Sequence, residues 1–168
     1  MNSGSYMNKI KRVLFVCLGN TARSPAAEYL ARYYAKENST DLIIASAGFI
    51  NAFSHIQRES QEFLNLRGID HSDFKPQLIS RELLEYQDLV LTMEKSHSKD
   101  IINKFRSIEN IDKKTFTLKE FNEESEDLDI IDPYYASNET YKQVLKIIDQ
   151  NVEKAIKKII YINNSLCV

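Results

Sequence analysis

A cysteine, an arginine and a serine lie close together in a segment near the start of the chain. Residues 16–25 read Val-Cys-Leu-Gly-Asn-Thr-Ala-Arg-Ser-Pro, with five residues between Cys17 and Arg23. A cysteine thiolate is a strong nucleophile, and a planar guanidinium can grip two oxygens of a tetrahedral oxyanion. Together they predict attack by Cys17 on a bound phosphate.

The elements on either side of this segment would make it an anion site. Residues 13–16 form a short apolar run typical of a buried strand, and Pro25 suits the first turn of a helix that we predict over 25–37. A loop entering a helix N-terminus directs backbone N–H groups into one concavity, where the helix dipole adds positive potential. Gly19 would let this loop bend tightly, and the positive potential would favour the thiolate form of Cys17.

The spacing of Cys17 and Arg23 is weak evidence when taken alone. The alternative is that Cys17 is a small buried apolar residue and Arg23 a surface charge. Strand, cysteine, glycine, arginine, serine and proline in this order are much harder to obtain by chance, so we favour the phosphate site.

Turnover through a phosphocysteine also needs a general acid for the leaving group. Residues 120–132 are rich in acidic residues, and this stretch ends in Ile-Ile-Asp-Pro-Tyr-Tyr, which contains Asp132. An Asp-Pro turn before the last helix would explain Asp132 equally well on spacing alone. Tyr134 and Tyr135 favour the acid, because they could wall a cleft and stack on an aromatic substrate.

Strands and helices alternate along the chain, which predicts right-handed βαβ units and a parallel sheet. The fold class that we expect is α/β, a single three-layer domain with a four-stranded parallel sheet flanked by helices on both faces. The domain would cover 9–163, after a flexible tail at 1–8. Ligands bind such sheets at the carboxyl ends of the strands, where the loop after the first strand would lie. The predicted strands are 13–16, 42–45, 88–93 and 115–118, and the predicted helices are 25–37, 57–67, 95–105 and 138–162.

Composition excludes several other classes of protein. The chain has 168 residues and a formal net charge of −2, so it lacks the overall positive charge that favours nucleic-acid binding. We expect no membrane span and no secretory signal. The default expectations are a reducing cytoplasm, because the chain has only two cysteines, and a monomer. Two cysteines far apart make neither a CxxC motif nor a disulfide framework. The four glycines form no dinucleotide or Walker signature, and His55 and His97 lack metal-ligand spacing.

At these residues the chain resembles the low-molecular-weight protein tyrosine phosphatases. The resemblance runs from about Lys11 to Ile160 and rests first on the Cys-x5-Arg-Ser-Pro loop. Asp132-Pro-Tyr-Tyr resembles the family's acid loop, Ser46-Ala-Gly its turn after the second strand, and Leu91-Thr-Met the end of its third strand. In larger tyrosine phosphatases the aspartate precedes the cysteine, so the order seen here distinguishes the small family.

The resemblance implies a role for each matching residue. Cys17 would be the nucleophile, Arg23 would bind phosphate, and Asp132 would act as general acid and then as general base. Asn20 would brace the loop, Ser24 would donate a hydrogen bond to the thiolate, and Ser46 would hold Asn20. The family uses no metal and no cofactor; its substrates are phosphorylated proteins, with inorganic phosphate or other oxyanions as competing ligands. The phosphate-binding loop would comprise Cys17, Leu18, Gly19, Asn20, Thr21, Ala22, Arg23 and Ser24.

The chain departs from the family pattern at the loop itself. Ala22 stands where many members have a second cysteine, so an oxidised Cys17 would lack a neighbouring partner; Cys167 is expected to be inert. The missing cysteine also argues against the related arsenate reductases. Thr21 stands where tyrosine-specific members often carry a bulky apolar residue. In a bacterial branch that resembles this family, threonine at that place accompanies activity on phosphoarginine.

These departures leave alternatives open beside the leading hypothesis of a phosphotyrosine phosphatase. The first is a protein arginine phosphatase in which Thr21 sets selectivity. The substrate cleft would contain Thr21, Tyr134 and Tyr135 in either case. The second is a non-catalytic phosphate-binding regulator, which is disfavoured because the cysteine, the arginine and the acid are all present. The family's histidine and arginine after the second helix are replaced by Asp73 and Pro76, so His71 has no assigned role.

Overall fold

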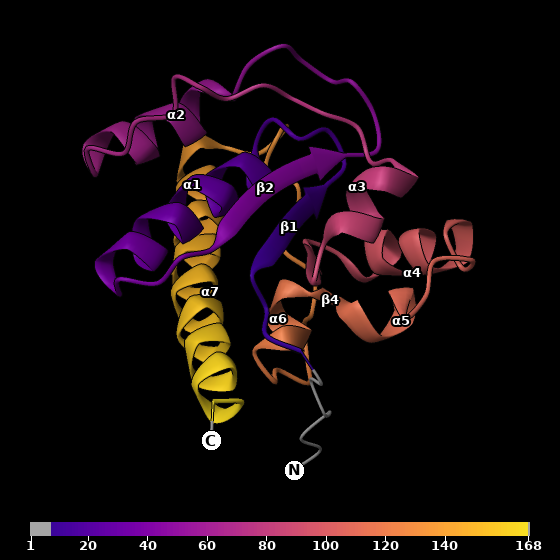
Figure 1. The fold of residues 1–168 in the computed structure, drawn as a ribbon. Coiled ribbons are helices and arrows are strands. Elements are labelled where there is room, and N and C mark those ends of the chain that lie inside the picture. The colour runs from indigo at the N-terminus through magenta and orange to yellow at the C-terminus, as the bar shows by residue number, and fades with distance from the viewer. Residues whose placement is uncertain (1–7, 168) are drawn as a thin grey trace.

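Four parallel strands form one sheet in the computed structural model, which describes residues 8–167 (Figure 1). The strand order is β2-β1-β3-β4, so β1 and β3 lie in the centre. Interior strands of a parallel sheet are buried on both faces, and β1 and β3 accordingly read as continuous apolar runs. The strands are β1 (Arg12–Cys17), β2 (Ile43–Gly48), β3 (Leu89–Thr92) and β4 (Thr115–Thr117).

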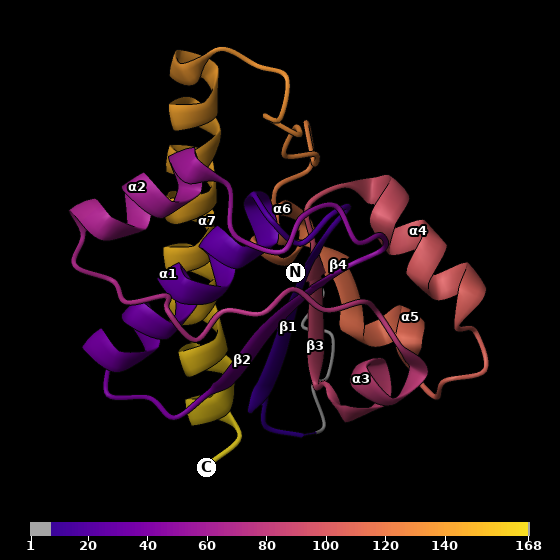
Figure 2. The same ribbon diagram turned by 90° about the horizontal axis from the view of Figure 1, so that it is seen from above.

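Helices cover both faces of the sheet. Figure 2 shows α1, α2 and α7 on one side of the strands and α3, α4 and α5 on the other. Alternate residues of β1 point to the two layers: Val13 and Phe15 join the core against α1 and α7, whereas Leu14 and Val16 join the core against α3 and α4. The helices are α1 (Arg23–Glu37), α2 (Arg58–Leu66), α3 (Arg81–Tyr86), α4 (Lys95–Lys104), α5 (Ile111–Lys114), α6 (Leu118–Phe121) and α7 (Asn138–Ser165).

The expected fold class, a three-layer α/β domain with a four-stranded parallel sheet, is confirmed. All eight predicted elements are present, with shifted ends. Helix α1 begins at Arg23 rather than Pro25, and Met93 lies just beyond β3. Three short helices, α3, α5 and α6, were not predicted, because one or two turns leave no periodic pattern. Helix α6, which leads into the acid-rich stretch 120–132, begins with a capping box between Thr117 and Glu120.

The two ends of the described chain meet at the edge of the sheet opposite the strands' carboxyl ends. The backbone N–H of Ile10 donates to Asn163 Oδ1 at 2.8 Å, and Asn163 Nδ2 returns a bond to the carbonyl of Ile10 at 2.7 Å. The predicted tail, 1–8, lies outside the described residues except for Asn8, so its boundary stays a prediction. Within 8–167, no helix has the length and apolar character needed to cross a membrane.

Candidate active site

The loop after β1 lies where the carboxyl ends of three strands meet. In the strand register, Cys17 stands beside Gly48, and Val16 stands beside Thr92. A side chain on Gly48 would come within 2.8 Å of the Asn20 nitrogen, so the glycine allows the loop to pack against β2. Backbone pairing therefore places Cys17 at the edge where open α/β sheets bind ligands.

The tight bend of the loop is made by Asn20 and not by Gly19. Asn20 has the positive φ, 51°, which asparagine tolerates better than most residues. Gly19 is needed for a different reason, since a Cβ there would lie 2.7 Å from the Cβ of Ala52. The expectation that Gly19 provides the bend was wrong; it provides room for a neighbouring loop.

The N-terminus of α1 opens toward the loop with its backbone donors uncapped. Ala22 is the N-cap and has no side-chain oxygen to satisfy the first N–H groups of the helix. Those donors and the helix dipole favour a bound anion at this end. Because the helix starts at Arg23, the guanidinium is carried on its first residue.

Cys17 and Ser24 are in direct contact beneath the loop. Cys17 is 2% exposed, and its Sγ lies 3.0 Å from Ser24 Oγ. Asn20 Nδ2 donates to Ser24 Oγ at 3.0 Å, which leaves the Ser24 hydroxyl hydrogen free for another acceptor. The sulfur is closer than the alternative, the carbonyl of Ala47 at 3.5 Å. A hydroxyl directed at Sγ would stabilise negative charge on the sulfur.

Asn20 joins the loop to β2 through a buried polar chain. Its Nδ2 also donates to Ser46 Oγ at 2.8 Å, and its Oδ1 accepts from the backbone N–H of Gln77 at 3.0 Å. Ser46 in turn donates to Glu28, a buried carboxylate on α1 that is paired with Arg32. Burial raises the pKa of Glu28, while the Ser46 hydrogen bond acts in the opposite direction. Sequence reasoning missed Glu28, although it lies one helical turn after Ser24.

Arg23 is buried among oxygen atoms of two segments, the start of α4 and residues 130–132. Its side chain is 2% exposed; Nη1 donates to the carbonyl of Ile130 at 2.7 Å and to Glu94. Its Nη2 lies 3.4 Å from Asp132 Oδ2. Glu94, the N-cap residue of α4, was also missed from the sequence. Its position just past the third strand, at the same edge of the sheet, was the available signal.

Asp132 lies across the phosphate-binding loop from α1, and residues of its own segment hold it there. Its Oδ1 accepts the backbone N–H of Tyr134 at 3.1 Å, so the Asp-Pro turn considered from the sequence is present as well. The segment is fastened to α4, since Ile130 N donates to the carbonyl of Met93 at 2.8 Å and Lys95 N donates to Asp129 at 2.7 Å. The second oxygen of Asp132 is left facing Arg23.

A cleft of about 600 Å³ opens above Cys17. Tyr134 packs on Phe53 with ring centroids 5.5 Å apart and on Tyr135 at 4.5 Å, so the cleft has an aromatic wall. Thr21 Oγ1 accepts from Gln57 Nε2 at 3.3 Å at the inner end. The three predicted cleft residues all line it. The lining residues not predicted as cleft or loop residues are Ile50, Ala52, Phe53, Gln57 and Ala136.

The three histidines lie in different surroundings. His97 is buried, with Nε2 4.0 Å from Glu94; burial lowers its pKa, and the Glu94 charge partly offsets this. His55 is exposed and His71 is half-buried, with His71 Nε2 2.9 Å from Asn65 Oδ1. In the part of the chain that the structure describes, no three His, Cys, Asp or Glu side chains are grouped to hold a metal ion.

The whole α/β unit that carries this site matches one protein family. Residues 12–162 match the model of the low molecular weight phosphotyrosine protein phosphatase family. The chain belongs to this family. The family membership predicted from the sequence is thereby confirmed. The protein is a phosphatase of this family, and its substrates are phosphoproteins.

Relatives of this phosphatase are named for two different phosphorylated residues, arginine and tyrosine. A protein-arginine-phosphatase of Bacillus subtilis is 32% identical over 148 residues, which cover 88% of this chain and 95% of that protein. The low molecular weight protein-tyrosine-phosphatase YfkJ of the same species is 31% identical over 155 residues, with 88% and 94% covered. The solved low molecular weight protein tyrosine phosphatase from T. tengcongensis is 36% identical, with a TM-score of 0.79 over 88% of this chain and 99% of its own.

Proposed function

We propose that this phosphatase hydrolyses phosphotyrosine in proteins through a phosphocysteine intermediate. The observation that carries the proposal is the aromatic wall above Cys17, formed by Tyr134, Tyr135 and Phe53. An aromatic ring in the cleft would stack on this wall, and its phosphate would reach the loop below.

The first step transfers the phosphoryl group to the enzyme. The Cys17 thiolate attacks phosphorus, an S–P bond forms and the O–P bond to the tyrosine breaks. The N–H groups of the loop and the Arg23 guanidinium stabilise the charge on the transferring oxygens. Asp132 donates its proton to the departing tyrosine oxygen. Tyr134 and Tyr135 hold the aromatic ring of the substrate at the mouth of the cleft.

The second step returns the enzyme to its starting state. A water molecule attacks the phosphocysteine, Asp132 takes a proton from that water, the S–P bond breaks and inorganic phosphate leaves. Ser24, 3.0 Å from the sulfur, supports the departing thiolate. Asn20 and Ser46 act as positioning residues, since their hydrogen bonds hold Ser24 and the loop in place.

A second candidate substrate is phosphoarginine. Thr21 lines the cleft beside Cys17. Its side chain is 2% exposed and lies at the inner end of the cleft. Its Oγ1 accepts from Gln57 and keeps a second lone pair for a guanidinium N–H. A threonine is smaller than a bulky apolar residue and would leave room for the guanidinium beside the nucleophile.

The test compares kcat/KM on a phosphotyrosine peptide and a phosphoarginine peptide for wild type, Cys17→Ser and Thr21→Ile. We expect phosphotyrosine to be preferred, with Thr21→Ile leaving that preference unchanged. A preference for phosphoarginine that Thr21→Ile removes would move the function to the second candidate. Activity on neither peptide, or activity that survives Cys17→Ser, would overturn the phosphocysteine mechanism.

A further inference from the structure

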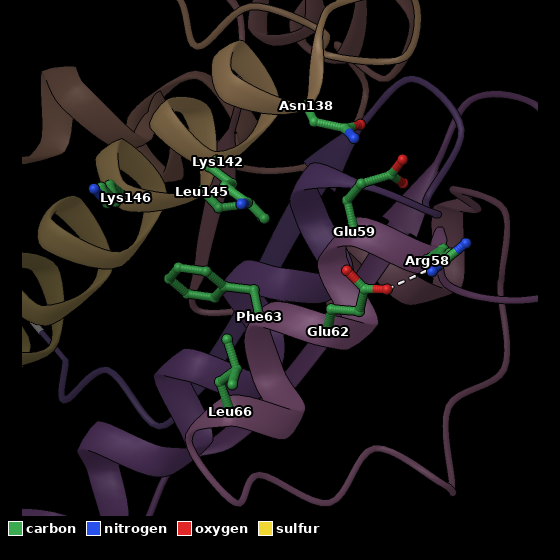
Figure 3. A pocket seen from close by; sticks show the side chains of 9 residues that line it. All are labelled: Arg58, Glu59, Glu62, Phe63, Leu66, Asn138, Lys142, Leu145 and Lys146. Atoms are coloured by element: carbon green, nitrogen blue, oxygen red, sulfur yellow. Dashed lines mark hydrogen bonds and ion pairs between the residues drawn. The ribbon is translucent and has the colours of Figure 1, made fainter.

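A second groove lies between α2 and the first turns of α7 and takes no part in the chemistry described above. Its volume is about 520 Å³, close to that of the catalytic cleft. Figure 3 shows its lining side chains, which come from these two helices only. They are Arg58, Glu59, Glu62, Phe63, Leu66, Asn138, Lys142, Leu145 and Lys146.

The groove has an apolar floor, of which Leu66 is the strongly exposed part. Phe63 points from α2 toward α7, and Leu145 lies across from it (Figure 3). Leu145 is 1% exposed, whereas Leu66, one turn beyond Phe63, is 89% exposed. A leucine this exposed beside an aromatic ring gains by packing against another apolar side chain. The floor therefore fits one apolar residue of a partner.

The α7 edge of the groove is positively charged. Lys142 and Lys146 are exposed and stand one turn apart on the same face of the helix. Neither pairs with an acidic side chain among residues 8–167. On the α2 edge, Arg58 Nε and Glu62 Oε1 are paired at 2.7 Å, while Glu59 has no ion-pair partner in the same range. A partner with carboxylates along the α7 edge would complement the two lysines.

The groove and the catalytic cleft are lined by neighbouring residues of the chain. Gln57 lines the cleft and the next residue, Arg58, lines the groove; likewise Ala136 lines the cleft and Asn138 lines the groove. Tyr141 joins the two helix starts through hydrogen bonds to Gln57 and Ser60, so a polypeptide leaving the cleft would cross over the outside of them to meet the groove. Leu66 lies eight residues beyond Arg58, about 12 Å along α2, which an extended chain covers in about four residues.

We propose that this groove binds the substrate polypeptide beside its phosphorylated residue, and that it selects an apolar residue with acidic residues beside it. The proposal rests on the proposed function, since it makes the groove an extension of the same substrate site. The apolar side chain packs on Phe63 and Leu66, above the buried Leu145, and the carboxylates face Lys142 and Lys146.

Three substrates test this assignment. The first is p-nitrophenyl phosphate, the second is phosphotyrosine flanked by single serines, and the third is a long peptide. The long peptide carries Glu-Glu-Leu before phosphotyrosine and Leu-Glu-Glu after it, with about four serine or glycine residues between each leucine and the phosphotyrosine. The groove variants are Leu66→Ser and Lys142→Glu. Tyr161→Ser and Lys154→Glu are the matched controls, because both residues are exposed on α7 outside the groove.

We expect wild type to have a higher kcat/KM on the long peptide than on the short one, and each groove variant to lower the long-peptide value about fivefold or more. The controls should keep the wild-type value, and all five proteins should hydrolyse p-nitrophenyl phosphate equally well. Equal rates on the two peptides, or equal losses in groove and control variants, would overturn the groove proposal alone.

Two other outcomes would also overturn it and would point elsewhere. Hydrolysis of p-nitrophenyl phosphate with no hydrolysis of either peptide would refute the proposed tyrosine phosphatase function, and the groove proposal with it. Dimerisation that Leu66→Ser abolishes, without any effect of peptide length, would assign the groove to a second copy of the chain. Light scattering on the same protein samples distinguishes these cases.

Discussion

Arg23 and Asp132 face each other across the candidate active site, with Nη2 3.4 Å from Oδ2. The arginine is buried on the first turn of α1, while the aspartate belongs to a partly exposed turn before α7. A bound phosphate needs the same guanidinium, so the carboxylate and the phosphate compete for it. In the proposed mechanism the proton of Asp132 would therefore be delivered close to the arginine that holds the phosphoryl group.

Replacing Asp132 should separate binding from turnover. Asp132→Ala removes the proposed proton donor, so kcat should fall about 10²- to 10⁴-fold, and most for phosphate esters with poor leaving groups. Inorganic phosphate should bind as tightly as before or more tightly, because a negative charge beside Arg23 is lost. Asp127→Ala, on a carboxylate that is 89% exposed, is the control. An unchanged kcat on a poor leaving group would exclude Asp132 as the acid.

Removing the hydroxyl beside the sulfur should slow the reaction without preventing phosphate from binding. Ser24→Ala deletes the group 3.0 Å from Sγ, and a hydrogen bond to a charged atom contributes about 1.5–3 kcal/mol, so kcat should fall about 10- to 100-fold. Because the thiolate is the leaving group of the second step, phosphoenzyme should accumulate. Rapid-quench measurement of the phosphoenzyme checks this. A higher KM with an unchanged kcat would show that Ser24 only shapes the loop.

Two glycines allow a matched test of loop packing. Gly48→Ala places a Cβ 2.8 Å from the Asn20 nitrogen, so the loop must shift and activity should fall at least tenfold. Gly68 has a φ of 67° after α2 and open space around its Cα, so Gly68→Ala should cost about 1 kcal/mol of stability and leave kcat/KM unchanged. Equal activity in the two variants would contradict the role given to Gly48.

The stability of the fold should depend on pH through His97. Burial lowers the pKa of His97 in the fold from 6.5, with Arg23 acting in the same direction and Glu94, Asp100 and Asp129 opposing it. The unfolded chain therefore binds this proton more readily, and stability falls as pH decreases from about 6.5 through the lower folded value. His97→Gln should flatten the decrease in Tm between about pH 7 and pH 5. An identical pH dependence in wild type and variant would disprove the assignment.

Oxidation of Cys17 should be hard to reverse. Ala22 supplies no second thiol on the loop, and Cys167 is exposed at the far end of α7, near the N-terminal end of β1 (Figure 1). A sulfenic acid without a thiol partner proceeds to irreversible acids under excess peroxide. Ala22→Cys should therefore raise the fraction of activity that dithiothreitol recovers. Full recovery in wild type that is lost in Cys167→Ser would show a Cys17–Cys167 bridge instead.

The sequence alone determined the features that depend on neighbouring residues. An apolar run, a loop and a proline in a first turn define β1, the phosphate-binding loop and the start of α1 because each is a local signal. The alternation of such elements determined the parallel sheet, and Tyr134 and Tyr135 were placed in the cleft by their proximity to Asp132 along the chain. The resemblance of these motifs to one family led to the same result.

Only the tertiary structure decided which distant groups share the site. Glu94 binds Arg23 and Phe53 completes the aromatic wall; the sequence indicated only that Glu94 follows the third strand, and it gave no indication for Phe53. Asn20 has the positive φ in the loop, and Ala52 occupies the space that a side chain on Gly19 would need. The second groove likewise exists only where α2 meets α7. Such contacts depend on how loops cross the edge of the sheet, and that path is set by packing between segments rather than by local propensity.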